Sequence, residues 1–298
     1  MTQGLPMPAV TPAPNQQHVV PFDGDFSLAD FQTSIDDMPS KKDLKKELKD
    51  LVEELHDLQR VLYADGRYAV LAVFQAMDAA GKDSTIRKVF SGVNPAGFRV
   101  EAFGVPSERE RKHDFLWRCA QALPERGKIG IFNRSHYEEC LVVRVKPELL
   151  DGQNLPNIDL PTIWDERLES IRQWERHLAR NGTVIVKFWL NVSQDEQKKR
   201  FLRRLNRADK HWKFSAADLD DRARWPEYMN AYQDALRQTS RDFAPWYAIP
   251  ADSKPYMRAA VARTMVHTLK QLDLAHPELS DKQRRALNAS REELVAPG

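Results

Sequence analysis

Residues 75–85 contain a glycine and a lysine at a spacing that suits phosphate binding. Gly81 and Lys82 follow an apolar run and precede a helical pattern, although Ala76 and Asp83 depart from the Gly-x-x-x-x-Gly-Lys-Ser/Thr pattern. In such a loop, backbone N–H groups at a helix N-terminus surround phosphate oxygens, and the lysine adds a point charge. We predict that this loop binds phosphate; the alternative is an ordinary strand-to-helix turn with an exposed lysine. The predicted phosphate-binding residues are Ala79, Ala80, Gly81, Lys82, Asp83 and Ser84.

Asp78 lies inside this loop, where a carboxylate would repel phosphate unless a cation stood between them. Mg²⁺ turns that repulsion into coordination, because it prefers oxygen ligands. We therefore interpret Asp78 as a metal ligand. The alternative is an aspartate that caps the helix or stabilises the turn.

A second group of candidates lies in residues 198–213, where eight residues are Lys or Arg and one is Asp. Such a segment repels itself unless an anion neutralises it. We predict a basic helical lid over about residues 198–222 that closes on phosphates. The alternative is a solvated helix face that packs through Leu202 and Leu205. The lid residues expected to contact phosphate are Arg203, Arg207, Lys210 and Lys213.

The elements that must position these side chains alternate between strand and helix. Apolar, β-forming segments predict strands over 69–75, 98–103, 128–132, 183–190 and 246–249. Helical patterns separate them over 83–91, 107–122, 162–181, 194–207 and 226–242. This alternation predicts an α/β fold with a five-stranded parallel sheet.

The chain is expected to contain one main domain with an extension at each end. Leucines repeat at spacings of three and four over residues 41–63, which predicts a helix packed on the domain or, alternatively, bound to a partner. We predict a partly disordered N-terminal extension over 1–40, with a mobile tail in its first 17 residues. The main domain is expected over 41–270, and a polar C-terminal tail, with a possible surface helix, over 271–298.

Composition excludes several classes of protein. The net charge is only +2, from 45 basic and 43 acidic residues, so this is no uniformly basic DNA-coating protein. The two cysteines, Cys119 and Cys140, exclude a disulfide scaffold or zinc ribbon and favour the reducing cytoplasm. The sequence contains no signal-peptide pattern, no apolar run that could span a bilayer and no Gly-x-Gly-x-x-Gly motif.

Five motifs together resemble the polyphosphate kinase 2 family: AMDAAGKDST, GVNPAGFRVEAFGVPSE, FLWR, FNRSHYEE and DKHWKFS. The resemblance runs from about residue 44 to residue 269. It implies a P-loop kinase fold similar to thymidylate kinases, with helices on both sides of the sheet. It also implies reversible phosphoryl transfer between inorganic polyphosphate and nucleotides, with Mg²⁺ or Mn²⁺ as cofactor.

The resemblance implies roles for individual residues. Asp78 matches the metal-binding loop aspartate, Lys82 the P-loop lysine, and Arg134 the phosphate-gripping arginine after the third strand, so these three are the candidate catalytic residues. Arg118 and Arg144 fall on arginine positions of the family and are candidates for phosphate binding. For each of them a surface salt bridge is the alternative.

Asn133 departs from the aspartate that many members of the family carry, and it resembles the class III branch, which is implied to accept both AMP and ADP. A neutral Asn supplies no carboxylate, so metal binding would fall on Asp78 and Glu138. Nucleotide binding is expected at Asn133, Arg134 and Glu138.

The expected activity is therefore the formation of ADP and ATP from AMP, ADP and polyphosphate, with guanine nucleotides as further candidates. The expected partners include no nucleic acid, because RNA-binding aromatic motifs are absent, and no membrane. A homo-oligomer is expected, with the 41–63 helix as a candidate interface. The alternatives are an ATP-dependent nucleoside monophosphate kinase and a non-catalytic polyanion-binding module.

Overall fold

Five strands form one parallel sheet, as the sequence predicts, and their order in it is β2-β3-β1-β4-β5. The structure is a computed structural model that describes residues 18–213 and 217–295, except for the side chains of Lys210 and Lys213. The expected tail over 1–17 lies outside the described residues. The strands are β1 (Ala69–Gln75), β2 (Phe98–Ala102), β3 (Ile129–Asn133), β4 (Thr183–Asn191) and β5 (Trp246–Pro250).

Strand register brings the candidate motifs together. Strand β1 lies between β3 and β4, and Phe74 of β1 pairs with Asn133 of β3. The loops that follow β1 and β3 therefore meet at the carboxyl edge of the sheet. Open α/β sheets bind their ligands at this edge, where neighbouring connections diverge.

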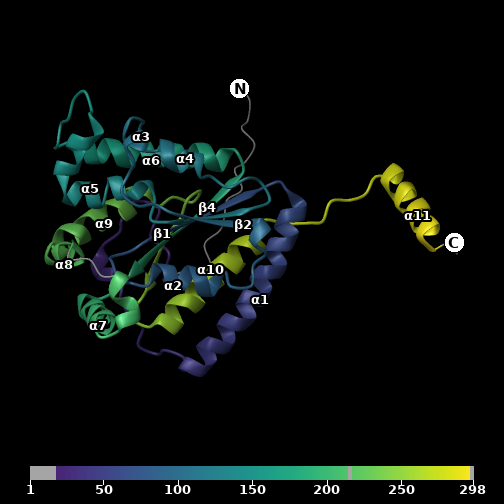
Figure 1. Cartoon of the computed structure of the whole chain (residues 1–298), viewed down its shortest axis with the longest axis horizontal. Helices are drawn as coiled ribbons and strands as arrows, with labels where there is room; N and C mark the ends of the chain where they lie inside the picture. The colour runs from purple at the N-terminus through teal and green to yellow at the C-terminus, as the bar shows by residue number, and fades with distance from the viewer. Residues whose placement is uncertain (1–17, 214–216, 296–298) are drawn as a thin grey trace.

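Helices cover both faces of the sheet (Figure 1). One face carries α1 (Lys41–Asp65), α2 (Lys82–Val89) and α10 (Lys254–Lys270), and the other carries α4 (Trp117–Gln121), α6 (Ile163–Arg180) and α9 (Trp225–Thr239). Ser40 caps α1 by accepting the Asp43 N–H (3.2 Å), and Gly66 ends the helix with a φ of +66°. The leucine stripe of α1 packs on the core, as predicted.

The predicted lid consists of α7 (Gln194–Leu205), the 3₁₀ helix η6 (Ala208–Lys213) and α8 (Ala217–Ala223). Helices α7 and α8 lie beyond the carboxyl edge of the sheet, and α7 is next to the N-terminus of α2 (Figure 1). Between β3 and α6 the chain forms the 3₁₀ helix η4 (His136–Glu139), α5 (Val142–Val145) and the 3₁₀ helix η5 (Pro147–Gln153).

One helical prediction was wrong, and one helix was missed. The helix expected over 107–122 is divided into α3 (Glu108–Arg111) and α4, because α3 buries no residue and Asp114 accepts the Leu116 N–H (2.9 Å), which starts a new turn. Helix α10 was not predicted, although eleven of its residues are buried.

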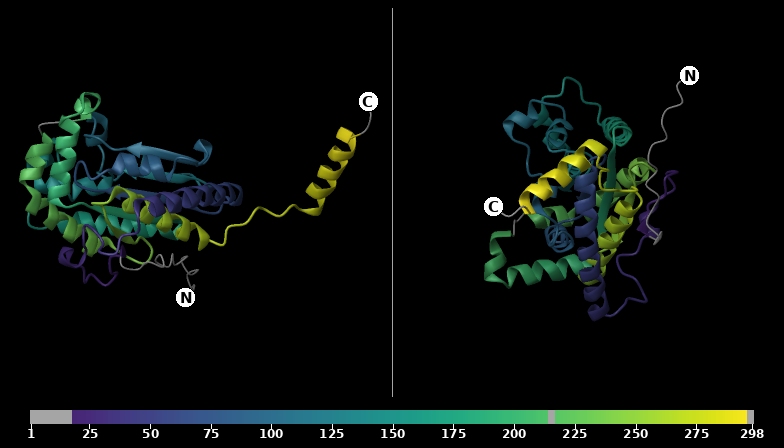
Figure 2. Two further views of the ribbon diagram at one scale, coloured as in Figure 1. Left: turned by 90° about the horizontal axis from the view of Figure 1, so that it is seen from below. Right: turned by 90° about the vertical axis from the view of Figure 1, so that its right-hand side faces the viewer.

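The two ends of the described chain differ in their packing. Val20 donates its N–H to the Trp246 carbonyl (3.0 Å), so the segment before α1 covers the β5 edge of the sheet. Helix α11 (Asp281–Val295) projects away from the sheet and buries no residue (Figure 2). Within the described residues, no helix combines the length and the apolar character needed to cross a membrane.

Candidate active site

The loop between β1 and α2 contains two residues with positive φ angles. Gly81 adopts a φ of +111° at the start of α2, and Ala79 adopts a φ of +61°, so both are in the left-handed region. The Lys82 side chain is buried, and its amine donates to the Ala76 carbonyl (2.6 Å). The sequence therefore folds locally as predicted, with the lysine held beneath the loop.

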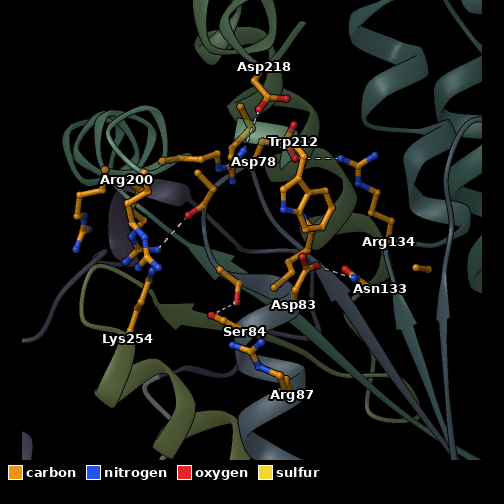
Figure 3. Close-up of a pocket in the computed structure, with 18 of the residues that line it drawn as sticks. Asp78, Asp83, Ser84, Arg87, Asn133, Arg134, Arg200, Trp212, Asp218 and Lys254 are labelled. Carbon is orange, nitrogen blue, oxygen red and sulfur yellow. Dashed lines mark hydrogen bonds and ion pairs between the residues drawn. The ribbon is translucent and has the colours of Figure 1, made fainter. Parts of the chain in front are cut away.

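Asp78 and Arg134 form an ion pair between the β1 and β3 loops (Figure 3). Arg134 Nη2 donates to Asp78 Oδ1 (3.0 Å), and the Arg134 N–H donates to the Phe74 carbonyl (3.1 Å). Arg134 has a φ of +65°, an unusual conformation for a residue with a side chain. Burial acts to raise the pKa of Asp78, but the charges of Lys82 and Arg134 outweigh it and lower that pKa, so the carboxylate is ionised at neutral pH.

The two departures from the usual motifs contact each other. Asn133 Nδ2 donates to Asp83 Oδ1 (2.9 Å), so the amide that replaces an aspartate binds the carboxylate that replaces a Ser or Thr (Figure 3). An aspartate at position 133 would instead face Asp83 with like charge. The neutral Asn133 is thus matched to this loop.

A cavity of about 890 Å³ opens in front of the loop. Three carboxylates line it, from Asp78, Asp83 and Asp218. The lining is otherwise strongly cationic, with Lys82, Arg87, Arg134, Arg200, Arg203, Arg204, Arg207 and Lys254. The structure thus brings two predicted lid residues, Arg203 and Arg207, to the same cavity as the loop.

Arg200 supports the loop from behind. Its side chain is buried, and it donates to Glu196 (2.8 Å), to the Ala80 carbonyl and to the Ala251 carbonyl (2.6 Å). It therefore joins α7 to the loop between β1 and α2 and to the end of β5. Charge pattern alone does not distinguish this brace from its exposed neighbour Arg203.

Lys254, at the start of α10, is a cavity residue that sequence reasoning missed. Burial lowers its pKa to about 8, with Arg200, Arg203 and Arg258 acting in the same direction and Glu196 against them. An anion in the cavity would favour the charged amine and raise this pKa. Arg87, on α2, also lines the cavity and was also missed. Neither Arg87 nor Lys254 lies in a run of basic residues, which was the pattern used to find the lid residues.

A second cavity, of about 390 Å³, is also lined by the Asp78–Arg134 pair. Its walls are more apolar, with Phe103, Val105, Val142, Tyr228 and Tyr232, and its polar lining includes Arg118 and Glu138. Arg118 is buried and donates to the Gly104 carbonyl (2.8 Å). Arg144 lines neither cavity and pairs with Asp234 (2.6 Å), which agrees with the salt-bridge alternative. Asp78 and Arg134 line both cavities.

Comparison with known proteins identifies the family. The family model described as polyphosphate kinase 2 matches residues 38–277, most of the chain. The chain belongs to the polyphosphate kinase 2 family.

Relatives of this polyphosphate kinase 2 chain have names that specify their substrates. An ADP-polyphosphate phosphotransferase from Rhodopseudomonas palustris is 50% identical over 239 residues, which are 80% of this chain and 83% of the relative. An AMP/ADP-polyphosphate phosphotransferase from Meiothermus ruber is 49% identical over 220 residues, 74% of this chain and 79% of the relative. A crystal structure of polyphosphate kinase 2 from Arthrobacter aurescens superposes with a TM-score of 0.81 at 37% identity and covers 89% of this chain and 93% of that chain.

A buried polar network supports the β3 loop of this polyphosphate kinase 2. Lys187 on β4 donates to Glu175 (2.6 Å), to the Tyr137 hydroxyl (2.9 Å) and to the Thr239 carbonyl (2.9 Å), and both charged groups are buried. His136 is wholly buried next to Glu175 (3.7 Å), which agrees with a structural role rather than that of a base.

Proposed function

We propose that this chain transfers the terminal phosphoryl group of inorganic polyphosphate to AMP and to ADP, forming ADP and ATP. The position of the Asp78–Arg134 pair between a cationic cavity and a more apolar cavity carries this proposal. Polyphosphate, the highly charged donor, can then bind in one cavity and the nucleotide acceptor in the other, with their reacting phosphates next to Asp78 and Arg134.

The larger cavity suits polyphosphate. Each internal phosphate of the polymer carries about one negative charge, and this cavity presents lysines and arginines from α2, α7 and α10. Arg203 remains well exposed although it pairs with Glu196, so an incoming phosphate can reach its guanidinium. Arginine suits such contacts because its planar fork binds two oxygens at once.

The smaller cavity suits the nucleotide. Tyr228, Tyr232 and Phe103 offer apolar and aromatic surface for a base, and Arg118 and Arg134 offer charge for its phosphates. AMP is one phosphate shorter than ADP, so the cavity must accept the nucleotide at two depths. Asn133 lines the larger cavity and not this one, so AMP as an acceptor alongside ADP is supported by the 49% identical relative named an AMP/ADP-polyphosphate phosphotransferase. Guanine nucleotides are further candidates.

Asp78 and Glu138 are the carboxylates that would hold a divalent metal, Mg²⁺ or Mn²⁺. The charges of Asp78 and Glu138 act on each other, and two carboxylates fit Mg²⁺, which takes its other ligands from phosphates and water. Burial raises the pKa of Glu138, and a metal would favour its ionised form. When bound, such an ion neutralises charge on the transferring group.

The chain's own residues then hold and orient the phosphates. The amine of Lys82 donates to the Ala76 carbonyl. When phosphate binds, this amine would donate to a phosphate oxygen instead. Arg134 faces the same region from β3, and the N–H groups at the start of α2 face it from below. Phosphoryl transfer needs alignment and charge neutralisation more than a strong base, so no further group is required.

The test is to incubate the purified protein with polyphosphate, a divalent metal and AMP, ADP or GDP, and to separate the nucleotides by chromatography. We expect AMP to yield ADP and then ATP, with no second nucleotide as donor. A product that forms only when ATP is added would identify an ATP-dependent monophosphate kinase. Polyphosphate binding without any new nucleotide, and unaffected by Asp78→Asn, would identify a binding module.

A further inference from the structure

Helix α7 holds carbonyl groups of the loop between β1 and α2. Gln197 Nε2 donates to the Asp78 carbonyl (2.9 Å), and Arg200 donates to the Ala80 carbonyl. Gln197 and Arg200 are three positions apart, so they share the face of α7 that is turned to the loop. Gln197 is only 1% exposed and is not part of the lining of either cavity. It can therefore affect a bound substrate only through the residues that it contacts.

The bond from Gln197 fixes the orientation of one peptide group in the loop. A trans peptide is planar, and its C=O and N–H groups point in opposite directions. Because the Asp78 carbonyl is directed at Gln197, the Ala79 N–H of the same peptide is directed away from it. Ala79 lines the larger cavity and has a φ of +61°, which costs free energy for a residue with a side chain. The Gln197 bond thus stabilises a strained turn whose N–H groups can face an anion.

The oxygen of the Gln197 amide is bound to the other helix of the lid. Gln197 Oε1 accepts from Arg222 Nη1 (2.8 Å), and the same nitrogen donates to the Gln194 carbonyl (2.7 Å). Arg222 belongs to α8, whose Asp218 lines the larger cavity and whose Asp221 lines the smaller one. A substrate in either cavity would therefore lie against the helix that carries Arg222.

We propose that Gln197 is a positioning residue for Asp78 and that it couples the position of α8 to the loop between β1 and α2. This role rests on the proposed function, in which Asp78 and the N–H groups of the loop face the reacting phosphates. One amide makes both contacts, because its NH₂ group donates to the loop and its oxygen accepts from the lid. A glutamate at this position could accept from Arg222 but could not donate to the Asp78 carbonyl, so substitution separates the two contacts.

Steady-state kinetics of polyphosphate-dependent ATP formation test this role. We expect Gln197→Leu and Gln197→Glu each to lower kcat by about ten- to a hundredfold, because a displaced loop misaligns the reacting groups. The KM for ADP should change by less than about twofold, since Gln197 does not line the cavity proposed for the nucleotide.

Gln194→Leu is the matched control. It makes the same change at an exposed residue of α7 and keeps the carbonyl that Arg222 binds, so it should leave kcat unchanged. A near-normal kcat for Gln197→Glu would show that Gln197 only holds α7 to α8, and it would overturn the proposal.

A double-mutant cycle tests the coupling to α8. Arg222→Met removes the partner of the Gln197 oxygen and should lower kcat by a smaller factor than Gln197→Leu, because the amide still reaches Asp78. The double variant should be no slower than Gln197→Leu alone, because Arg222 acts through Gln197. Losses that multiply would show that Arg222 acts independently and would overturn the coupling.

Hydrogen exchange followed by mass spectrometry gives a readout that does not depend on activity. The amides of residues 79–82 should exchange faster in both Gln197 variants than in the natural chain or in Gln194→Leu, because the loop loses a hydrogen bond. Equal exchange in all four proteins would overturn the proposal. A natural chain that forms no nucleotide product from polyphosphate would refute the proposed function, and the exchange rates would still decide whether Gln197 positions the loop. Circular dichroism and thermal melting confirm that each variant is folded.

Discussion

The buried Lys187–Glu175 pair offers the sharpest test of what stabilises this fold. Glu175 is the counter-ion of an ammonium group that has no access to solvent, and the same network holds Tyr137 beneath the β3 loop. Burial lowers the pKa of Lys187 to about 8, and Glu175 acts against that shift. Replacing Glu175 therefore leaves an uncompensated charge inside the protein rather than merely removing a hydrogen bond.

Removing one partner of a buried ion pair costs about 3–5 kcal/mol. We expect Glu175→Gln to lower the free energy of unfolding by about 3 kcal/mol, because the amide oxygen still accepts a hydrogen bond from Lys187, and Glu175→Ala to lower it by about 5 kcal/mol. The double variant Glu175→Leu with Lys187→Met should regain most of the loss, since no charge is left buried.

Urea unfolding followed by circular dichroism measures these differences. Glu53→Gln is the control, because its pair with Lys49 (3.6 Å) is exposed and should contribute no more than about 0.5 kcal/mol. The Glu175→Gln variant should also gain stability as pH rises above 7, because the depressed pKa of Lys187 lets the unfolded chain bind more protons than the folded one. Equal losses for the Glu53 and Glu175 variants would refute the reasoning.

Three further predictions concern the site. Asp78→Asn and Lys82→Ala should each lower kcat for polyphosphate-dependent ATP formation by about 10²–10³ in a folded protein, and near-normal turnover of either would place the reaction elsewhere. Asn133→Asp should lower kcat/KM about tenfold or more by facing Asp83 with like charge, and a second change, Asp83→Ser, should restore it; full activity of the single variant would contradict this pairing. The KM for polyphosphate should rise above about pH 8 as Lys254 loses its proton, and an equally steep rise in Lys254→Met would exclude this lysine as the cause.

The strand, loop and helix around Gly81 and Lys82 could be predicted because their signals are local. Strand β1 is buried along its length and so reads as an unbroken apolar run, and Gly81 and Lys82 follow it directly. The pairing of Asn133 with Asp83 joins residues fifty positions apart, so only the register of β1 and β3 could reveal it.

Helix α10 illustrates what sequence could not provide. It contacts α1, α2 and two strands of the sheet, and its buried residues lie around most of its circumference. It therefore lacks the polar face that identifies an amphipathic helix. Because α10 was not predicted, the position of Lys254 at its start, and so in the cavity, could not be predicted either. The charges of the lid, by contrast, can be read from the sequence. The carbonyls that accept hydrogen bonds from Arg200 lie in loops distant in sequence, so its buried position could not be predicted.

Asp78 and Arg134 line both cavities, so under the proposed function the same two side chains would face the phosphoryl group whichever molecule carries it. Lowering a transition state lowers the barrier from both sides by the same amount. Under the proposed function, a substitution at either residue must therefore slow ATP synthesis and ATP consumption by one common factor and leave the equilibrium constant unchanged. Net flux through such a site follows the ratio of nucleotide to polymer concentrations, and the protein itself imposes no direction.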